Sequence, residues 1–270
     1  MLIIKVMDTN LQTAIKASLQ AGKAIMDVYD SVIEVAYKDD KSPLTLADTK
    51  SNDVINSFLK PTDIPIISEE NKQIDYTARK DWDTCWIVDP VDGTKEFIKR
   101  NGEFTVNIAL VKNGVPKLGV IYVPATKTLY FSDVDTNTSY KAILESHDTP
   151  FETVLATAQE LQPKPANSNP VQVVGSRSHM NQETLDFVEQ LKQEGCDVEI
   201  VSKGSSLKFC LVAEGLADVY PRYAPTMEWD TAAGQAICNG VGVMVISKET
   251  NQPLLYNKEN LLNPWFLVSK

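Results

Sequence analysis

The sequence predicts a mixed fold in which an α+β first half is followed by an α/β second half. Apolar residues recur at helical spacing over 10–29 and 46–58. Strand patterns lie at 32–37, 65–67, 86–88, 104–111, 118–123 and 128–131. Asn113-Gly114 between two of these strands is typical of a tight hairpin. Hairpin-linked strands pair in antiparallel fashion, so we expect an antiparallel sheet with helices in the first half.

Strand and helix patterns alternate in the second half. Strands are predicted at 171–174 and 198–201, and helices at 181–194 and 206–214. Such alternation indicates an α/β unit. Periodicity weakens between about 133 and 170, where Pro-rich and Asn-rich segments predict a loop. We therefore expect two domains, 1–165 and 166–270, of which the first carries most of the candidate site.

The charge of the chain limits what it binds. The 270 residues have a formal net charge of −10 and a pI near 4.8. This charge repels polyanions, which argues against a nucleic-acid polymer or an anionic membrane surface as the main partner. A phosphate ligand must therefore be met locally, by metal ions or by backbone N–H groups.

The cysteines and the N-terminus favour a cytoplasmic protein. The four cysteines form no CxxC pair, and a chain of this length needs no disulfides to hold a core. The apolar start is interrupted by Lys5 before it reaches the length of a signal-peptide core, and no run approaches a membrane span. Only two histidines are present, so a histidine-rich zinc site is excluded and oxygen ligands remain.

Acidic residues follow directly after apolar strand patterns, most clearly after the strand at 86–88. The segment Asp89-Pro90-Val91-Asp92-Gly93-Thr94 holds two carboxylates on one tight turn, because proline restricts its neighbour and glycine permits close backbone approach. Carboxylates, with a backbone carbonyl, suit Mg²⁺. A helix that begins after Thr94 would point free N–H groups at a phosphate. The alternative is that both aspartates only stabilise a turn.

Two further acidic segments have ordinary alternatives as well. Glu69-Glu70 follows the strand at 65–67, where it is either a ligand pair or an exposed acidic turn. Asp230, in Glu228-Trp229-Asp230, falls near a predicted helix start, where aspartate is a common N-cap.

Taken together, the three acidic segments resemble the inositol monophosphatase superfamily. Its hallmark is an acidic pair, then Asp-Pro-x-Asp-Gly-Thr, then Trp-Asp before a helix, and all three occur here in order. The resemblance runs from about Asp48 to Pro264 and is nearest to the CysQ-type 3'(2'),5'-bisphosphate nucleotidases. The segments that carry this closer likeness are 92–98, 101–107, 204–209 and 213–218. Val91 stands where the family usually has Ile or Leu, which puts nothing in doubt because only its carbonyl is expected to act.

The resemblance implies a fold, a reaction and a cofactor. The fold is the layered αβαβα sugar-phosphatase sandwich with the site between two subdomains. The reaction is hydrolysis of adenosine 3',5'-bisphosphate to AMP and phosphate by direct attack of water, with two or three Mg²⁺ ions that activate the water and stabilise charge. This reaction clears a by-product of sulfate assimilation. Inhibition by lithium, a monomer or homodimer, and peripheral contact with the inner membrane are compatible with the same resemblance.

The resemblance also implies roles for individual residues. The implied metal ligands are Glu69, Asp89, the Val91 carbonyl, Asp92 and Asp230. The implied catalytic residues are Asp48 and Thr94, which orient the water, and Glu70. The implied substrate-binding residues are Glu69, Val91, Asp92, Gly93, Thr94, Ser176, His179, Gly204, Lys208 and Asp230. Taken alone, His179 is an ordinary loop histidine and Lys208 a solvated helix lysine.

Other functions remain open from the sequence. Inositol monophosphatase would share the metal and water machinery, although the segments 95–97 and 204–208 are more similar to the nucleotidases. Fructose-1,6-bisphosphatase or inositol polyphosphate phosphatase activity is a further option. A nucleotide sensor without catalysis is another, against which the complete acidic set argues.

Overall fold

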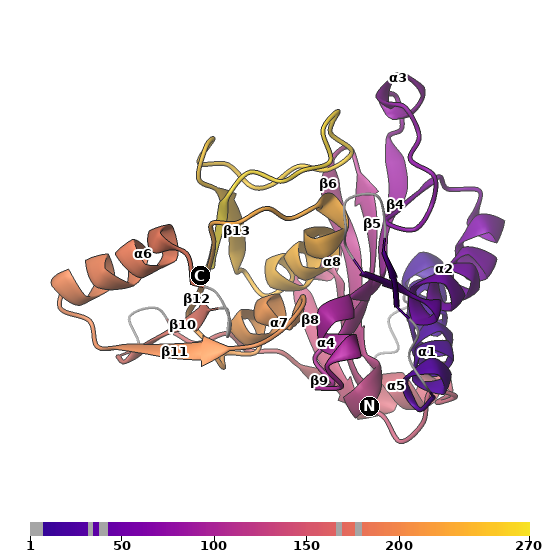
Figure 1. Ribbon diagram of the computed structural model, residues 1–270, viewed down its shortest axis with the longest axis horizontal. Helices are drawn as coiled ribbons and strands as arrows, with labels where there is room; N and C mark the ends of the chain where they lie inside the picture. The colour runs from indigo at the N-terminus through magenta and orange to yellow at the C-terminus, as the bar shows by residue number, and fades with distance from the viewer. Residues whose placement is uncertain (1–7, 32–34, 38–42, 166–168, 176–179) are drawn as a thin grey trace.

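Two large β-sheets alternate with three layers of helices in the computed structural model, which describes residues 8–31, 35–37, 43–165, 169–175 and 180–270 (Figure 1). One outer layer holds α1 (Thr9–Tyr29) and α2 (Leu46–Leu59), and the other holds α6 (Gln182–Gln193). Between the sheets lie α7 (Leu207–Ala213) and α8 (Glu228–Asn239). This arrangement confirms the predicted αβαβα sandwich.

The first sheet contains seven strands in the order β3-β4-β5-β6-β7-β8-β9. They are β3 (Ile66–Ser68), β4 (Thr84–Asp92), β5 (Thr105–Lys112), β6 (Val115–Val123), β7 (Thr128–Asp133), β8 (Thr138–Ile143) and β9 (Gln159–Glu160). All neighbours pair antiparallel except β3 and β4, which run parallel. The expectation of a wholly antiparallel sheet was therefore wrong at this edge, because a long crossover that includes α3 (Tyr76–Arg79) replaces a tight turn.

The helices α1 and α2 cover one face of this sheet. In α1 the residues at helical spacing, such as Leu11, Ile15 and Ile25, are fully buried, as the sequence predicted. Gly22 allows α1 to pack closely against β6, since a Cβ at Gly22 would lie 2.4 Å from the ring of Tyr122.

The second sheet has the order β11-β10-β12-β14-β13. Its strands are β10 (Val171–Gly175), β11 (Val198–Ser202), β12 (Val219–Arg222), β13 (Met244–Ser247) and β14 (Phe266–Ser269). The two sheets divide the chain between Glu160 and Val171, close to the predicted boundary at 165. The two-domain division stays a prediction, because α8 from the second half packs on β5 and β6 of the first.

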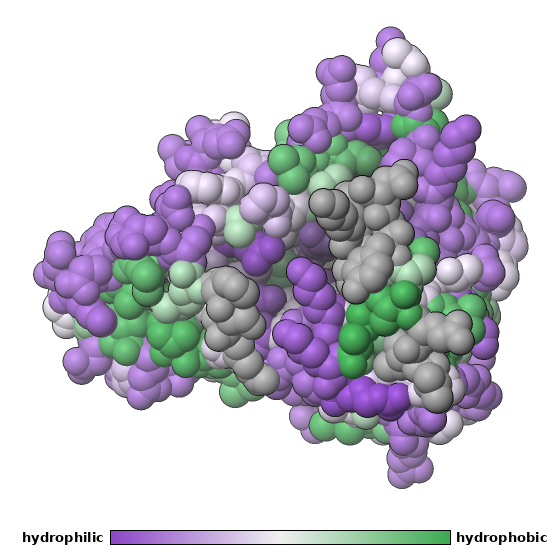
Figure 2. Space-filling view, in the orientation of Figure 1, coloured by the Kyte–Doolittle hydropathy of each residue, from purple (hydrophilic) through white to green (hydrophobic). Residues whose placement is uncertain are grey.

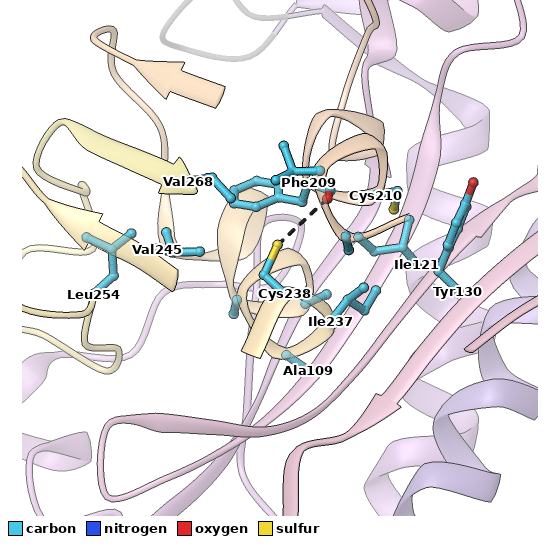
Figure 3. Packing of buried hydrophobic residues seen from close by; sticks show 14 of the residues in the cluster. Ala109, Ile121, Tyr130, Phe209, Cys210, Ile237, Cys238, Val245, Leu254 and Val268 are labelled. Atoms are coloured by element: carbon cyan, nitrogen blue, oxygen red, sulfur yellow. Dashed lines mark hydrogen bonds between the residues drawn. The ribbon is translucent and has the colours of Figure 1, made fainter. Parts of the chain in front are cut away.

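One buried apolar cluster joins both sheets around α7 and α8. Figure 3 shows Ala109 and Ile121 from the first sheet and Val245 and Val268 from the second on either side of Phe209. The Cys238 thiol in α8 donates to the Phe209 carbonyl at 3.7 Å. The two halves of the chain are thus joined by one shared hydrophobic core.

Short elements account for most of what the sequence did not predict. They are β2 (Pro43–Thr45), α5 (Phe151–Thr157) and the 3₁₀ turns η1 (Lys60–Thr62), η2 (Pro124–Thr126) and η3 (Val134–Thr136). The strand β1 (Val35–Tyr37) lies within the strand predicted at 32–37, and α4 (Thr94–Ile98) begins where a helix was considered. The strands β8 and β9 fall in the region predicted as loop. Within the described ranges, no helix combines the length and apolarity needed to cross a membrane.

Candidate active site

The strand β4 delivers two aspartates to the cleft edge. It continues through Pro90 to Asp92, and its pairing with β5 shifts register between Asp89 and Asp92. Asp89 is 1% exposed, and its Oδ1 accepts the Val91 N–H at 3.0 Å. The helix α4 then begins at Thr94, after Gly93 in the left-handed region with φ of 94°. The predicted turn with a following helix is confirmed.

Asp230 meets these two aspartates from the other half of the chain. Carboxylate oxygens of Asp89, Asp92 and Asp230 lie within 4.8 Å of one another. Asp230 is in the first turn of α8, and its Oδ2 accepts the Met227 N–H at 2.8 Å. Asp230 is therefore not the N-cap residue, which is Met227, but the third residue of α8, and it bonds back to Met227 while it faces the cluster.

The cluster concentrates negative charge in a buried place. Burial, followed by the charge of Glu69, raises the pKa of Asp89 well above its ordinary value. Burial, followed by the charge of Asp92, raises the pKa of Asp230 to about 7. Cations would relieve this repulsion, and carboxylate oxygens are the ligands that Mg²⁺ prefers. The residues present therefore fit a divalent metal site.

Glu69 and Glu70 lie at the same edge of the sheet, because β3 runs parallel to β4. The Glu69 N–H donates to the Val88 carbonyl at 3.2 Å. Glu69 is not one of the three converging carboxylates, yet its charge acts on both Asp89 and Asp230. The Glu70 N–H lies 3.4 Å from Ser68 Oγ, and its side chain is half-buried.

Asp48 and Thr94 form a pair beside the cluster. Thr94 Oγ1 lies 3.3 Å from Asp48 Oδ1 and 3.3 Å from the Val91 carbonyl oxygen. Asp48 Oδ2 accepts the backbone N–H and the hydroxyl of Thr45, each at 2.7 Å, in a capping box that begins α2. Two helix starts therefore hold this pair beside the acidic cluster.

The cleft itself has a volume of about 550 Å³ and is lined from both halves of the chain. The expected residues on its wall are Asp92, Gly93, Gly204, Lys208 and Asp230. In Figure 2 the surface over α4, in the middle of the view, is hydrophilic. Ser176 and His179, the other expected nucleotide-binding residues, lie outside the described residues.

Lys208 belongs to the cleft and is not a solvated helix lysine. Its Nζ donates to the Ser205 carbonyl at 3.0 Å and lies 5.9 Å from the centre of the Tyr220 ring. Burial lowers the pKa of Lys208, while the charge of Asp92 opposes this effect. A phosphate that displaces water here would meet a poorly hydrated cation.

The structure adds cleft residues that sequence reasoning did not select. These are Lys95, Lys99, Glu103, Lys203, Ser206 and Arg222, together with Asn107 below them. Among the described residues, the buried side-chain atoms without a hydrogen-bond partner are Thr105 Oγ1, Asn107 Oδ1, Ser205 Oγ and Arg222 Nε. All four belong to residues that line or border the cleft, which is the pattern expected where a polar ligand completes the bonding. Sequence reasoning did not select these cleft residues because they are single residues of common types, spread along the chain, that form no recognisable motif.

Comparison with known proteins agrees with this site. The model of the inositol monophosphatase family matches residues 7–265. The chain is 41% identical over 263 residues to the 3'(2'),5'-bisphosphate nucleotidase CysQ of Salmonella typhimurium, a match that covers 96% of this chain and 99% of the relative. It is 42% identical over 254 residues to the protein of the same name from Escherichia coli K12, with 92% and 95% covered.

A solved structure gives the same picture in three dimensions. The crystal structure of CysQ from Bacteroides thetaiotaomicron, a bacterial member of the inositol monophosphatase family, has a TM-score of 0.87 at 49% sequence identity. The match covers 98% of both chains. Since the family model spans nearly the whole sequence and the relatives match it end to end, the chain belongs to the inositol monophosphatase family.

Proposed function

We propose that the protein is a magnesium-dependent 3'(2'),5'-bisphosphate nucleotidase that hydrolyses adenosine 3',5'-bisphosphate to AMP and phosphate. The observation that carries the proposal is the convergence of Asp89, Asp92 and Asp230 beside a cleft that also contains lysines and an arginine. The acidic cluster suits the metal side of the reaction, and the basic wall suits a second phosphate. The names of the relatives with 41% and 42% identity support the same substrate.

The metal site is assigned to carboxylates at the meeting point of the two halves. We assign Asp89, Asp92, Asp230, the Val91 carbonyl and Glu69 as ligands of two or three Mg²⁺ ions. When bound, such ions lower the pKa of water and stabilise charge on the attacking and leaving oxygens. Glu70, next to Glu69, is assigned to steer the attacking water.

Asp48 and Thr94 are assigned to move the proton of the attacking water. The water attacks phosphorus in line with the 3'-oxygen, a P–O bond forms, and the P–O bond to the 3'-oxygen breaks. The water gives its proton to Thr94 Oγ1, and the hydroxyl proton of Thr94 passes to Asp48 Oδ1, 3.3 Å away. The 3'-oxygen leaves as a hydroxyl after it takes a proton from solvent.

The second half is assigned to hold the nucleotide. Gly204 and Lys208 lie on the cleft wall, where the lysine supplies a point charge to the phosphate that is not cleaved. By resemblance, Ser176 and His179 complete the set. Gly93 and Thr94, which begin α4, lie where the cleaved phosphate would be received.

The cellular setting follows from the reaction and the composition. We place the enzyme in the cytoplasm, where it would clear the nucleotide by-product of sulfate assimilation, as a monomer or homodimer. Peripheral contact with the inner membrane would not be electrostatic, since the net charge is −10.

One substrate panel tests the proposal. Phosphate release is measured with Mg²⁺ from adenosine 3',5'-bisphosphate, inositol 1-phosphate and fructose 1,6-bisphosphate, and we expect the highest kcat/KM for the nucleotide. A preference for inositol 1-phosphate would instead make the protein an inositol monophosphatase. Binding of Mg²⁺ and nucleotide without turnover would indicate a sensor.

A further inference from the structure

Asp92 is held by two polar side chains that have no assigned role. Ser206 Oγ, at the start of α7, donates a short hydrogen bond to Asp92 Oδ2. Asn107 Nδ2, on β5, donates to Ser206 Oγ at 2.6 Å and lies 3.3 Å from the same Asp92 oxygen. Both donors are buried, with 2% of Ser206 and 1% of Asn107 exposed. Asp92 thus lies at the end of a buried relay of hydrogen bonds.

We propose that Ser206, supported by Asn107, is a positioning residue that orients the Asp92 carboxylate for metal binding. This inference rests on the metal site of the proposed function.

The geometry gives the relay a direction. A serine hydroxyl has one proton, and a neutral asparagine amide donates but does not accept at Nδ2. Asn107 therefore donates to Ser206, which directs the serine proton to Asp92. The hydrogen bonds from Ser206 and Asn107 both end on Oδ2 of Asp92, so the other oxygen keeps its lone pairs for a cation. Hydrogen bonds to a charged acceptor are about twice as strong as neutral ones, which suits a fixed carboxylate.

The relay also crosses between the halves of the chain. Asp92 ends a strand of the first sheet, whereas Ser206 belongs to the segment 204–208 that is assigned to the nucleotide. The Ser206 hydroxyl lies 3.4 Å from the Asp230 carbonyl oxygen as well. One side chain therefore touches both aspartate-bearing segments, and its loss would loosen their mutual placement. Residues that orient metal ligands change metal affinity by about 10–100-fold when they are replaced.

The test measures metal affinity directly and needs no turnover. Mn²⁺ binding to the purified full chain is titrated by electron paramagnetic resonance, without nucleotide. We expect Ser206→Ala to weaken Mn²⁺ binding by roughly 10–100-fold. Ser206→Thr retains a hydroxyl and should restore most of the affinity. Ser206→Cys keeps a side chain of similar volume, but a thiol is a weak hydrogen-bond donor. It should therefore also weaken Mn²⁺ binding, which separates the loss of the donor from any loss of stability in Ser206→Ala.

A matched control separates orientation from simple loss of a buried hydroxyl. Ser139 is fully buried, and its Oγ donates to the Ile237 carbonyl at 2.7 Å near the other end of α8. Ser139→Ala should lower the unfolding midpoint while Mn²⁺ affinity stays unchanged. Wild-type affinity in both Ser206→Ala and Ser206→Cys would overturn the inference, as would a loss in Ser206→Thr equal to that in Ser206→Ala.

The outcome is distinct from that of the substrate panel. If the wild-type chain binds Mn²⁺ but does not hydrolyse the nucleotide, the proposed function fails and the positioning role of Ser206 remains testable. If activity is present, the Ser206→Ala variant should require more Mg²⁺ for half-maximal rate, with a smaller change in kcat at saturating Mg²⁺.

Discussion

The Glu103 carboxylate, from the first half of the chain, accepts the backbone N–H of Gly204 in the second half at 2.9 Å. Its other oxygen lies 3.3 Å from Lys203 Nζ. Glu103 is 8% exposed, so the contact is shielded from water. A buried carboxylate therefore fixes the backbone of the segment that leads into Lys208.

Glu103→Ala should weaken nucleotide binding more than metal binding. The substitution removes a hydrogen bond between a charged group and the backbone, worth about 1.5–3 kcal/mol, so we expect KM to rise roughly 10-fold or more. Glu103→Gln keeps an oxygen for the Gly204 N–H and should have a smaller effect. The exposed Glu249, replaced by Ala, serves as the control. An unchanged KM in Glu103→Ala would contradict the role.

Asp89→Asn should raise the stability of the metal-free protein and lower its phosphatase activity. The substitution removes one charge from the acidic cluster, which relieves repulsion, and we expect the protein in chelator to gain about 0.5–2 kcal/mol of unfolding free energy. Phosphatase activity should fall by at least about 100-fold, because the charge that would hold the metal is lost. Thermal unfolding with and without Mg²⁺ checks both parts. Mg²⁺ should stabilise the wild type and have little effect on the variant. Unchanged activity would remove the basis of the proposed site.

Gly119→Ala should disturb the packing that places Asp230. A Cβ at Gly119, on β6, would lie 2.5 Å from the Ala233 carbonyl oxygen in α8. Overpacking of this kind costs about 1–3 kcal/mol, measured by denaturant unfolding. Because α8 carries Asp230, Mn²⁺ affinity should fall as well. Gly195→Ala is the comparison for backbone strain without overpacking, since its φ is 90° and no atom lies within 4 Å of a Cβ there. It should lower stability without changing Mn²⁺ affinity, and an equal loss of Mn²⁺ affinity in the two variants would argue against a role of the β6–α8 packing.

His147 should make the stability depend on pH. Burial, followed by the charge of Lys127, lowers the pKa of His147, whose Nδ1 lies 2.7 Å from the Tyr122 hydroxyl. The unfolded chain therefore binds a proton more readily than the folded one just below the ordinary histidine pKa of about 6.5, so stability decreases as the pH falls through that window. Unfolding free energies at pH 7.5 and 5.5 should differ less in His147→Gln than in the wild type. Equal differences would show that His147 does not contribute.

The long elements could be predicted because their own residues specify them. The apolar spacing of α1 and α2 reflects one buried face each, and the hairpin at Asn113-Gly114 is set by local backbone preference. The missed elements β8 and α5 each bury one apolar residue, Ala142 and Val154 respectively, so no apolar period emerges from their sequences. The strand β9 has two residues, both exposed. Their strands and helix are stabilised by neighbours rather than by local propensity.

The candidate site divides in a similar way. Asp89 and Asp92 are close in sequence, so their shared turn could be inferred from the proline and glycine around them. Three cleft lysines, Lys95, Lys99 and Lys203, were not selected from the sequence, and neither was Ser206. Their place in the cleft became visible only when the segments were placed together.

The sequence alone determined which chemical groups are available. It has few histidines, which leaves oxygen ligands for a metal, and it has the Asp-Pro-x-Asp turn and the order of three acidic segments that marks the family. Tertiary structure alone decided that Ser206 and Glu103 bind across the two halves, whereas the family resemblance already implied that Asp230 joins Asp89 and Asp92. The physical reason is that these contacts join residues about 100 or more positions apart, for example Ser206 and Asp92 at a separation of 114. Only the packing of α7 and α8 between two sheets brings such residues within hydrogen-bonding distance.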